Sequence, residues 1–306
     1  MDKIDIALWS ADLSHPIDGI GAWASLVERQ MIAARAAGTP LLVMPEWIAA
    51  HWLSFAPPGL AATDEVAWMA DQAGAALTLL RVLVTRHQVA LVAGTMPHAL
   101  GGGRHANRAW VLLPDGAVLY QDKLCMTPGE KAADGWFLTP GHQLNIIAWQ
   151  GLRLAITICL DVELPALAAR LVEAAPDLLL VPSMTGLRSG YNRVFGCARA
   201  RAIELSTVVA AVGCRGTVQR PVSAPMTNYS GASVFLPCEA ALGFDGIGPA
   251  MVADDGGTGE GPLLIASGLP VGHCRSLRTG AAEVWPGAWR ADHLAITPTP
   301  VTAAAE

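Results

Sequence analysis

Two segments of this chain resemble each other and limit the folds that it can adopt. Residues 34–47, ARAAGTPLLVMPEW, and residues 171–184, LVEAAPDLLLVPSM, each contain a helix end, a small polar break, an apolar strand and a proline at the strand end. Glu46 in the first segment corresponds to Ser183 in the second. This similarity predicts two like halves whose sheets pack against each other, with the ends of equivalent strands close together.

Alternating strand and helix patterns indicate an α/β or layered α+β fold. We expect apolar strands at 4–9, 41–44, 89–95, 108–113, 118–122, 152–158 and 208–212, and helices at 21–37, 64–87, 165–173 and 193–206. The glycine-rich residues 101–107, GGGRHAN, predict a flexible loop. Among 306 residues, 52% are hydrophobic and only 15% are charged, which is enough for a large apolar core.

The pattern predicts a single domain over residues 1–296. Within this domain, we expect residues 245–296 to form a C-terminal arm that packs in an oligomer. Trp285 and Trp289 in this arm could equally cover the chain's own core. Residues 297–306, TPTPVTAAAE, have little apolar surface to bury, so we expect them to form a disordered tail.

Charge and cysteine patterns argue against several function classes. The net charge of −6 comes without a basic block, which argues against a nucleic-acid partner. Arg81 and Arg86 interrupt the most apolar segment, and the N-terminus lacks the pattern of a signal peptide, so we expect a cytoplasmic protein without a membrane partner. The six cysteines form no CxxC pair and no HExxH helix occurs, so we expect no metal and no cofactor. A small-molecule substrate fits best.

Chemically reactive side chains stand at the ends of three predicted strands. Cys159 ends the strand in LAITICLDVELP, Glu46 follows the strand in LLVMPEW, and Lys123 follows the strand at 118–122. Taken singly, each has an ordinary explanation: an inert core thiol, a partly exposed carboxylate and a solvated lysine. At Cys159 the chain turns from strand to helix, where backbone N–H groups can lower the pKa of a thiol and bind an oxyanion. Asp161 is either a cap for the following helix or a direct participant.

Together the three residues supply the parts of a covalent hydrolase. A thiol nucleophile needs a base, and the attacked carbonyl needs positive charge to stabilise its oxyanion. Glu46 has apolar neighbours, where desolvation raises the pKa of a carboxylate toward neutrality, as a general base requires. No GxSxG motif supports a serine hydrolase, and His142, the histidine nearest in sequence to Cys159, has no recognisable partner.

The order of these motifs resembles that of the carbon-nitrogen hydrolase (nitrilase) superfamily. From the first strand to about residue 240, the chain contains in order LLVMPEW, GTMPH, NRAWVLLPDGAVLYQDKL, PGEK, GLRLAITICLDVELP, ARARAIE and SGAS. The resemblance implies a four-layer αββα sandwich with two like halves. It also implies a homodimer or higher homo-oligomer stacked through helices, and chemistry without metal or cofactor.

The resemblance also implies a role for each site residue. Cys159 is the nucleophile, Glu46 the general base and Lys123 the cation that stabilises the oxyanion. Glu130, in PGEK, matches a second glutamate that positions the substrate and the lysine, and the backbone N–H of Leu160 is a second oxyanion donor. Attack on an amide leaves a thioester on the cysteine, which water then hydrolyses.

Residues next to the reactive ones resemble an amide-cleaving branch of the family. Leu160-Asp161 stands where nitrile-cleaving members have Trp-Glu, and Val162-Glu163 stands where enzymes for N-carbamoyl amino acids have arginines. Cys125 replaces a histidine that many relatives carry. We therefore expect an amidase for small linear amides, with a nitrilase and a catalytically silent binding protein as alternatives.

Two further residues are expected to contact the substrate. Met184 follows a strand end and Trp136 follows Glu130 in a loop, so both can line the pocket, although core packing explains them equally well. Glu163 has no predicted role.

Overall fold

The computed structural model describes residues 1–218, 226–257 and 259–296. The predicted disordered tail at 297–306 lies outside the described residues. None of the helices in the described part of the chain is long and apolar enough to cross a membrane.

The first sheet has six strands in the order β14-β1-β2-β3-β4-β5. Its strands are β1 (Ile4–Trp9), β2 (Leu41–Val43), β3 (Ala90–Gly101), β4 (Arg104–Leu112), β5 (Val118–Asp122) and β14 (Leu263–Leu269). The central strands β1, β2 and β3 are parallel, and β14, β4 and β5 join them by antiparallel pairing.

The second sheet repeats this arrangement, in the order β6-β7-β8-β9-β12-β13. Its strands are β6 (Ile147–Trp149), β7 (Leu152–Ile156), β8 (Leu178–Ser183), β9 (Val208–Gly213), β12 (Ala232–Phe235) and β13 (Ile247–Ala250). Here β7, β8 and β9 are parallel and the outer strands antiparallel. Because β2 and β8 hold equivalent positions, the two like halves predicted from the similar segments are confirmed. A separate two-stranded ribbon consists of β10 (Gly216–Val218) and β11 (Met226–Asn228).

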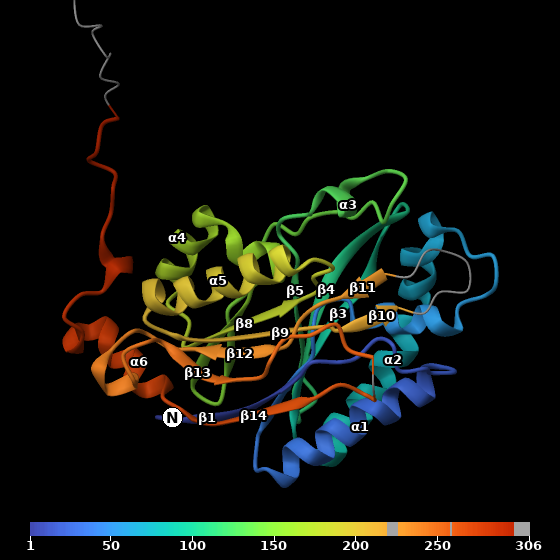
Figure 1. Ribbon diagram of the computed structural model, residues 1–306, viewed down its shortest axis with the longest axis horizontal. Coiled ribbons are helices and arrows are strands. Elements are labelled where there is room, and N and C mark those ends of the chain that lie inside the picture. The colour runs from blue at the N-terminus through green and yellow to red at the C-terminus, as the bar shows by residue number, and fades with distance from the viewer. Residues whose placement is uncertain (219–225, 258, 297–306) are drawn as a thin grey trace, which may run out of the picture.

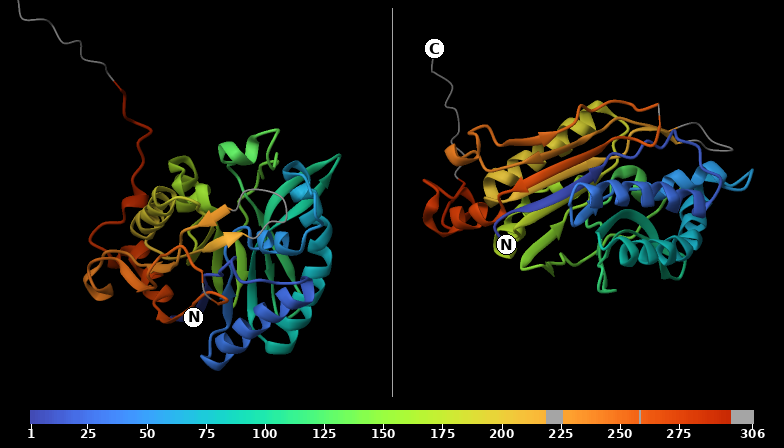
Figure 2. Two further views of the ribbon diagram at one scale, coloured as in Figure 1. Left: turned by 45° about the vertical axis from the view of Figure 1, so that its right-hand side comes forward. Right: turned by 90° about the horizontal axis from the view of Figure 1, so that it is seen from below.

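Helices cover the outer face of each sheet. On the first sheet lie α1 (Ile20–Ala36) and α2 (Glu65–His87), and on the second lie α4 (Pro165–Ala174) and α5 (Arg188–Leu205). The two helix pairs stand on opposite sides of the molecule (Figure 1), and the layered order is visible from two further directions (Figure 2). Two short helices, α3 (Pro128–Lys131) and α6 (Val271–Ser276), lie outside these layers. The predicted αββα sandwich is confirmed.

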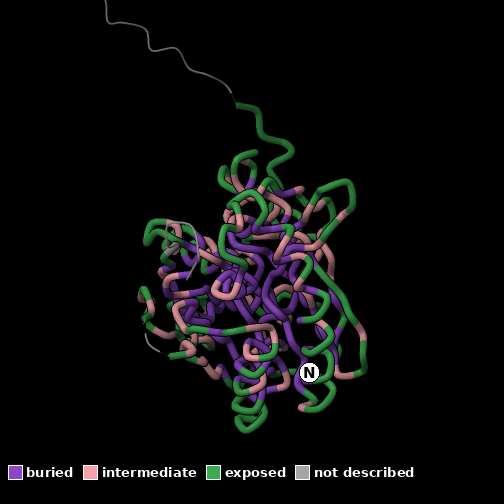
Figure 3. The backbone as a smooth tube through the Cα atoms, turned by 90° about the vertical axis from the view of Figure 1, so that its right-hand side faces the viewer, coloured by how far each residue is buried: buried purple, intermediate pink, exposed green. Residues whose placement is uncertain are grey.

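Side-chain alternation explains why the sheets pack in this order. In β1, Ile6 and Leu8 belong to the apolar cluster shared with the second sheet, whereas Ala7 and Trp9 belong to the cluster under α1 and α2. The central strands therefore bury both faces. Buried residues are concentrated in the middle of the molecule (Figure 3).

The predicted flexible loop at residues 101–107 is wrong. β3 continues to Gly101 and β4 starts at Arg104, so the two strands form one long hairpin with a tight turn. Gly101, Gly102 and Gly103 have φ of 84°, 59° and 72°, a conformation that glycine adopts without steric cost.

The predicted C-terminal arm begins inside the sandwich. Of residues 245–296, β13 extends the second sheet and β14 pairs antiparallel with β1 in the first. Beyond them, Arg275 and Arg278 each lie 2.8 Å from the buried carboxylate of Asp177, and the indole N–H of Trp285 donates to the carbonyl of Glu204. These contacts hold the segment on its own chain, and a role in oligomer packing stays a prediction.

Candidate active site

Four of the predicted site residues converge at one end of the two sheets. Glu46 follows β2, Lys123 follows β5 directly, Glu130 lies in α3, and Cys159 begins a 3₁₀ turn (Cys159–Glu163) after β7. All four are buried, with exposed fractions of 1% for Glu46 and Lys123 and 6% for Glu130 and Cys159. The strands run toward the same region, so the polar residues that end them meet there.

Lys123 stands between two carboxylates. Its Nζ donates to Oε1 of Glu46 at 2.8 Å and to Oε1 and Oε2 of Glu130 at 2.8 and 2.7 Å. Burial lowers the pKa of Lys123, whereas the neighbouring carboxylates raise it. The carboxylates prevail, so the pKa lies above its usual value. The ammonium therefore keeps its charge in a buried position.

The two carboxylates beside this lysine differ in their ionisation. Burial raises the pKa of Glu46 to about 7, against the attraction of Lys123. Burial raises the pKa of Glu130, but the charge of Lys123, with the hydrogen bonds from Lys123 and Thr127, outweighs it, so the net pKa is lowered. Glu130 and Thr127 also form a reciprocal cap of α3, which fixes the second carboxylate. The pKa values of the two carboxylates are thus separated, and that of Glu46 lies near neutrality.

The backbone at Cys159 has an unusual conformation. Its φ is 51°, in the left-handed region that side chains other than glycine rarely adopt and that often marks functional sites. The thiol lies 3.7 Å from the carbonyl oxygen of Met184, whose N–H donates to Oε2 of Glu46 at 2.9 Å. Burial, followed by the charge of Glu46, raises the pKa of the thiol well above its usual value. The sequence pattern had suggested a lowered pKa; here desolvation dominates, so the resting thiol holds its proton and needs a base.

Asp161 is a structural partner of the cysteine turn. Its carboxylate is 1% exposed and accepts the backbone N–H groups of Leu124, Cys125 and Ile158 at 2.8 to 3.2 Å. It thereby ties the chain after Lys123 to the turn that holds the thiol. The predicted cap of the following helix is not found, because α4 begins without a side-chain cap; the carboxylate holds the turn at Cys159 instead.

A cavity of about 380 Å³ opens beside the thiol. Its wall includes all four converging residues together with Met184, Trp136 and Trp47. The two indole rings lie 4.3 Å apart between centroids, and the N–H of Trp136 donates to Glu65 at 3.0 Å. Both predicted substrate-contacting side chains therefore line the cavity. An indole wall favours apolar groups in the substrate.

A smaller adjoining cavity, of about 200 Å³, also reaches Cys159 and includes Leu160. Glu163, which had no predicted role, lies in its wall and pairs with Arg193 at 3.0 Å. At Cys125, which replaces the common histidine, the structure shows only the backbone N–H donated to Asp161 at 2.8 Å.

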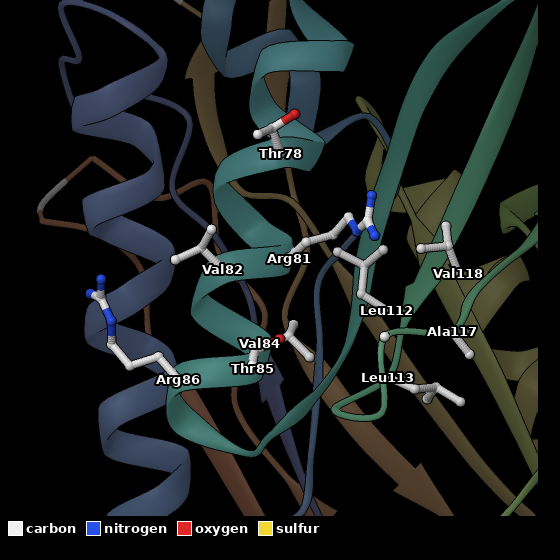
Figure 4. Close-up of a pocket in the computed structure, with 11 residues that line it drawn as sticks. Thr78, Arg81, Val82, Val84, Thr85, Arg86, Leu112, Leu113, Ala117 and Val118 are labelled. Carbon is white, nitrogen blue, oxygen red and sulfur yellow. The ribbon is translucent and has the colours of Figure 1, made fainter.

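A third hollow lies away from the thiol. It has a volume of about 540 Å³ and lies between α2 and the turn that joins β4 to β5 (Figure 4). Arg81 and Arg86 stand on its helical side and Leu112 and Val118 on its strand side. Its described lining residues include no cysteine, histidine or carboxylate, and none of the four converging residues. Among residues 1–218, 226–257 and 259–296, no group of three or more His, Cys, Asp or Glu is placed to hold a metal ion.

Sequence reasoning missed two contributors to the site. Asn107 donates to Glu46, and the indole N–H of Trp47 lies 3.3 Å from Oε1 of Glu130. Both residues lie in motifs that carried the resemblance, NRAWVLLPDGAVLYQDKL and LLVMPEW, but a neutral side chain gives no chemical signal of its own.

A family model described as carbon-nitrogen hydrolase matches residues 10–258 of the chain. The chain belongs to the carbon-nitrogen hydrolase family, as its motifs predicted.

The curated relatives are hydrolases, and one of them is an amidase. The chain is 27% identical over 229 residues to a probable hydrolase, YhcX, of Bacillus subtilis, covering 74% of this chain and 43% of that protein. It is 30% identical over 175 residues to an (R)-stereoselective amidase of a Pseudomonas species, covering 56% and 58%. The chain thus spans about half the length of these curated relatives.

Solved structures share the fold. A mutant amidase from Nesterenkonia sp. AN1 in complex with butyramide has a TM-score of 0.68 at 23% identity, covering 91% of this chain and 95% of that one. A carbon-nitrogen hydrolase from Helicobacter pylori G27 has a TM-score of 0.72 at 17% identity, covering 91% and 92%. These structures show that the chain shares the fold of solved carbon-nitrogen hydrolases.

Proposed function

We propose that this protein hydrolyses a small linear amide to a carboxylic acid and ammonia or an amine, through a thioester on Cys159. The observation that carries the proposal is the common cavity of Cys159, Glu46, Lys123 and Glu130, in which a buried protonated thiol lies beside a carboxylate with a pKa of about 7. The amidases among the relatives support the same reaction class.

The first step forms the bond between the thiol sulfur and the carbonyl carbon. Glu46 takes the thiol proton as the sulfur attacks, and the carbonyl π electrons move to the oxygen. Lys123 and the N–H of Leu160 stabilise the resulting oxyanion. Glu130, ionised and held by Thr127, keeps the lysine charged and in place.

The second step breaks the carbon-nitrogen bond. Glu46 returns its proton to the leaving nitrogen, ammonia or an amine departs, and an acyl thioester remains on Cys159. Water then enters, Glu46 takes one of its protons, and the water oxygen attacks the thioester carbon. The carbon-sulfur bond breaks, the acid is released, and Glu46 returns the proton to the sulfur, which restores the free thiol. The same carboxyl group thus acts as base and acid in turn, which suits a pKa of about 7.

The acyl part of the substrate is assigned to the wall formed by Trp136, Trp47 and Met184. These side chains are apolar, and the cavity of about 380 Å³ is suited to a small acyl group. An amide is preferred over a nitrile because Leu160-Asp161 follows the cysteine, the pattern of amide-cleaving branches.

The test compares Cys159→Ala with Cys274→Ala, which removes a buried thiol of α6 that does not line the cavity beside Cys159. Ammonia release from a panel of small amides is expected in the wild type and in Cys274→Ala and is expected to be lost in Cys159→Ala. Unchanged turnover in Cys159→Ala would refute the covalent mechanism. Faster acid formation from a matched nitrile would make the protein a nitrilase, and no turnover of either class by the wild type would favour a binding protein.

Two expectations stay predictions beside this proposal. The chain is expected to act in the cytoplasm and to form a homodimer or larger homo-oligomer. Sedimentation of the purified protein tests the second.

A further inference from the structure

Asn107 contacts every charged member of the catalytic cluster. It lies in β4 and is fully buried. Its side-chain Nδ2 lies 2.9 Å from Oε1 of Glu46 and 3.3 Å from Oε1 of Glu130, and its backbone carbonyl accepts the N–H of Lys123 at 2.9 Å. The amide must present its NH₂ group here, because an oxygen in that place would face two carboxylate oxygens.

The other end of the same amide has no partner. Oδ1 of Asn107 is buried and accepts no hydrogen bond from the residues that the structure describes. A buried polar atom without a partner destabilises the folded state. A residue selected for stability alone would satisfy both ends, so the unpaired oxygen suggests that the NH₂ group serves the site.

Lys123 has no N–H group left for a substrate in this resting arrangement. An ammonium group has three donors, and its three contacts are Oε1 of Glu46 and both oxygens of Glu130. To stabilise an oxyanion, the lysine must turn one donor away from a carboxylate. Glu46 is the carboxylate that loses its hydrogen bond from Lys123, because Glu46 becomes neutral when it takes the thiol proton.

At that moment Glu46 needs another group to hold it. We propose that Asn107 is a positioning residue that keeps the carboxyl group of Glu46 aligned with Cys159 while Lys123 turns a donor to the oxyanion. A neutral amide can do this in both protonation states of Glu46, since its N–H binds either a carboxylate or a carboxyl oxygen. The inference rests on the proposed amide hydrolysis and adds the step at which the lysine changes partners.

A hydrogen bond from Asn107 also favours the ionised form of Glu46. Lys123 favours that form as well, while Glu130 and burial oppose it, and the thiols of Cys159 and Cys214 are the remaining titratable groups beside it. Removing the donor therefore raises the pKa of Glu46. If Asn107 served only in packing, its removal would leave the pKa of Glu46 unchanged.

The test uses Asn107→Leu, Asn107→Ser and the control Asn145→Leu, which removes a partly exposed amide bonded to the carbonyl of Tyr120. Alkylation of Cys159 by iodoacetamide is followed by mass spectrometry from pH 5 to 9, which needs no substrate. In Asn107→Leu the midpoint of the alkylation rate is expected to move up by about one pH unit.

For amide turnover by Asn107→Leu, kcat is expected to fall roughly 10- to 100-fold, with KM within about threefold of the wild type. Asn107→Ser, which keeps one donor, is expected to lie between, and Asn145→Leu to match the wild type.

A folded Asn107→Leu with a wild-type midpoint and kcat within about twofold would overturn the proposal. If that variant does not fold, wild-type behaviour of Asn107→Ser would overturn it instead. If the wild type cleaves no amide but the alkylation midpoint moves as expected, the proposed reaction fails and the positioning role of Asn107 stands.

Discussion

The carboxyl group of Glu46 destabilises the folded state to an extent that depends on pH, and Glu46→Gln removes this dependence. Burial raises its pKa in the folded protein from the usual 4.5 to about 7. Below pH 4.5 the group is protonated whether the chain is folded or not, so it has no effect. Between pH 4.5 and about pH 7 the unfolded chain releases this proton whereas the folded chain keeps it, so the free energy of unfolding falls as pH rises. Each pKa unit is worth about 1.4 kcal/mol, and the total loss by pH 7 to 8 is about 3 kcal/mol.

Glutamine cannot ionise, so the variant should escape this loss. We expect the free energy of unfolding of Glu46→Gln to increase, relative to that of the wild type, by about 3 kcal/mol between pH 4.5 and 8, so that the variant becomes the relatively more stable protein. Any effect of the glutamine on Lys123 or on the N–H of Met184 shifts the whole curve and leaves its slope unchanged. The assay is urea unfolding at several pH values, with Glu173→Gln, a half-exposed carboxylate of α4, as the control. Parallel pH curves for Glu46→Gln and the wild type would refute the assignment of the raised pKa to this residue.

Three further predictions concern the groups around Glu46. The acid limb of kcat/KM should have a midpoint near pH 7, because Glu46 must be ionised to take the thiol proton; a midpoint below pH 5.5 would contradict that role. Asp161→Ala should lower the free energy of unfolding by about 3 to 5 kcal/mol, since three buried N–H groups lose their acceptor, as urea unfolding would show; a loss under 1 kcal/mol would refute its anchoring role. Trp136→Ala should lower kcat/KM more for amides with long acyl chains than for acetamide, and equal losses across the series would remove Trp136 from the acyl site.

The residues of the candidate site were predictable because their chemistry conflicts with their surroundings. A thiol, a carboxylate and an amine at the ends of apolar strands are costly to bury singly, and that cost pointed to a shared site. Cys159, Glu46, Lys123 and Glu130 do meet, in the arrangement that the motif order implied. The repeated segment likewise predicted the two like halves, since β2 and β8 occupy equivalent places in their sheets.

The features that were missed depend on contacts between distant segments. Nothing local in β14 indicates that it pairs with β1, more than 250 residues earlier, so its sequence was interpreted as part of an arm. The three glycines at 101–103 were interpreted as flexible, although positive φ makes them a tight turn between long strands. The role of Asn107 came only from the two carboxylates that the fold places beside it.

The thiol proton was the other feature that local sequence could not settle. A strand-to-helix corner predicts N–H groups that lower the pKa of a thiol, but the corner at Cys159 is buried, and desolvation together with Glu46 raises the pKa instead. The depth of burial is a property of the assembled sandwich, so it becomes visible only in the structure.

The central claim is a covalent acyl intermediate on Cys159, and mass spectrometry of the intact protein tests it most directly. Wild-type protein mixed with a slowly hydrolysed small amide and quenched in acid should gain the mass of the acyl group. Peptide mapping should place that mass on Cys159, and Cys159→Ala should show neither the adduct nor turnover. Turnover of the same amide by Cys159→Ala, or an acyl group on another residue during wild-type turnover, would contradict the account.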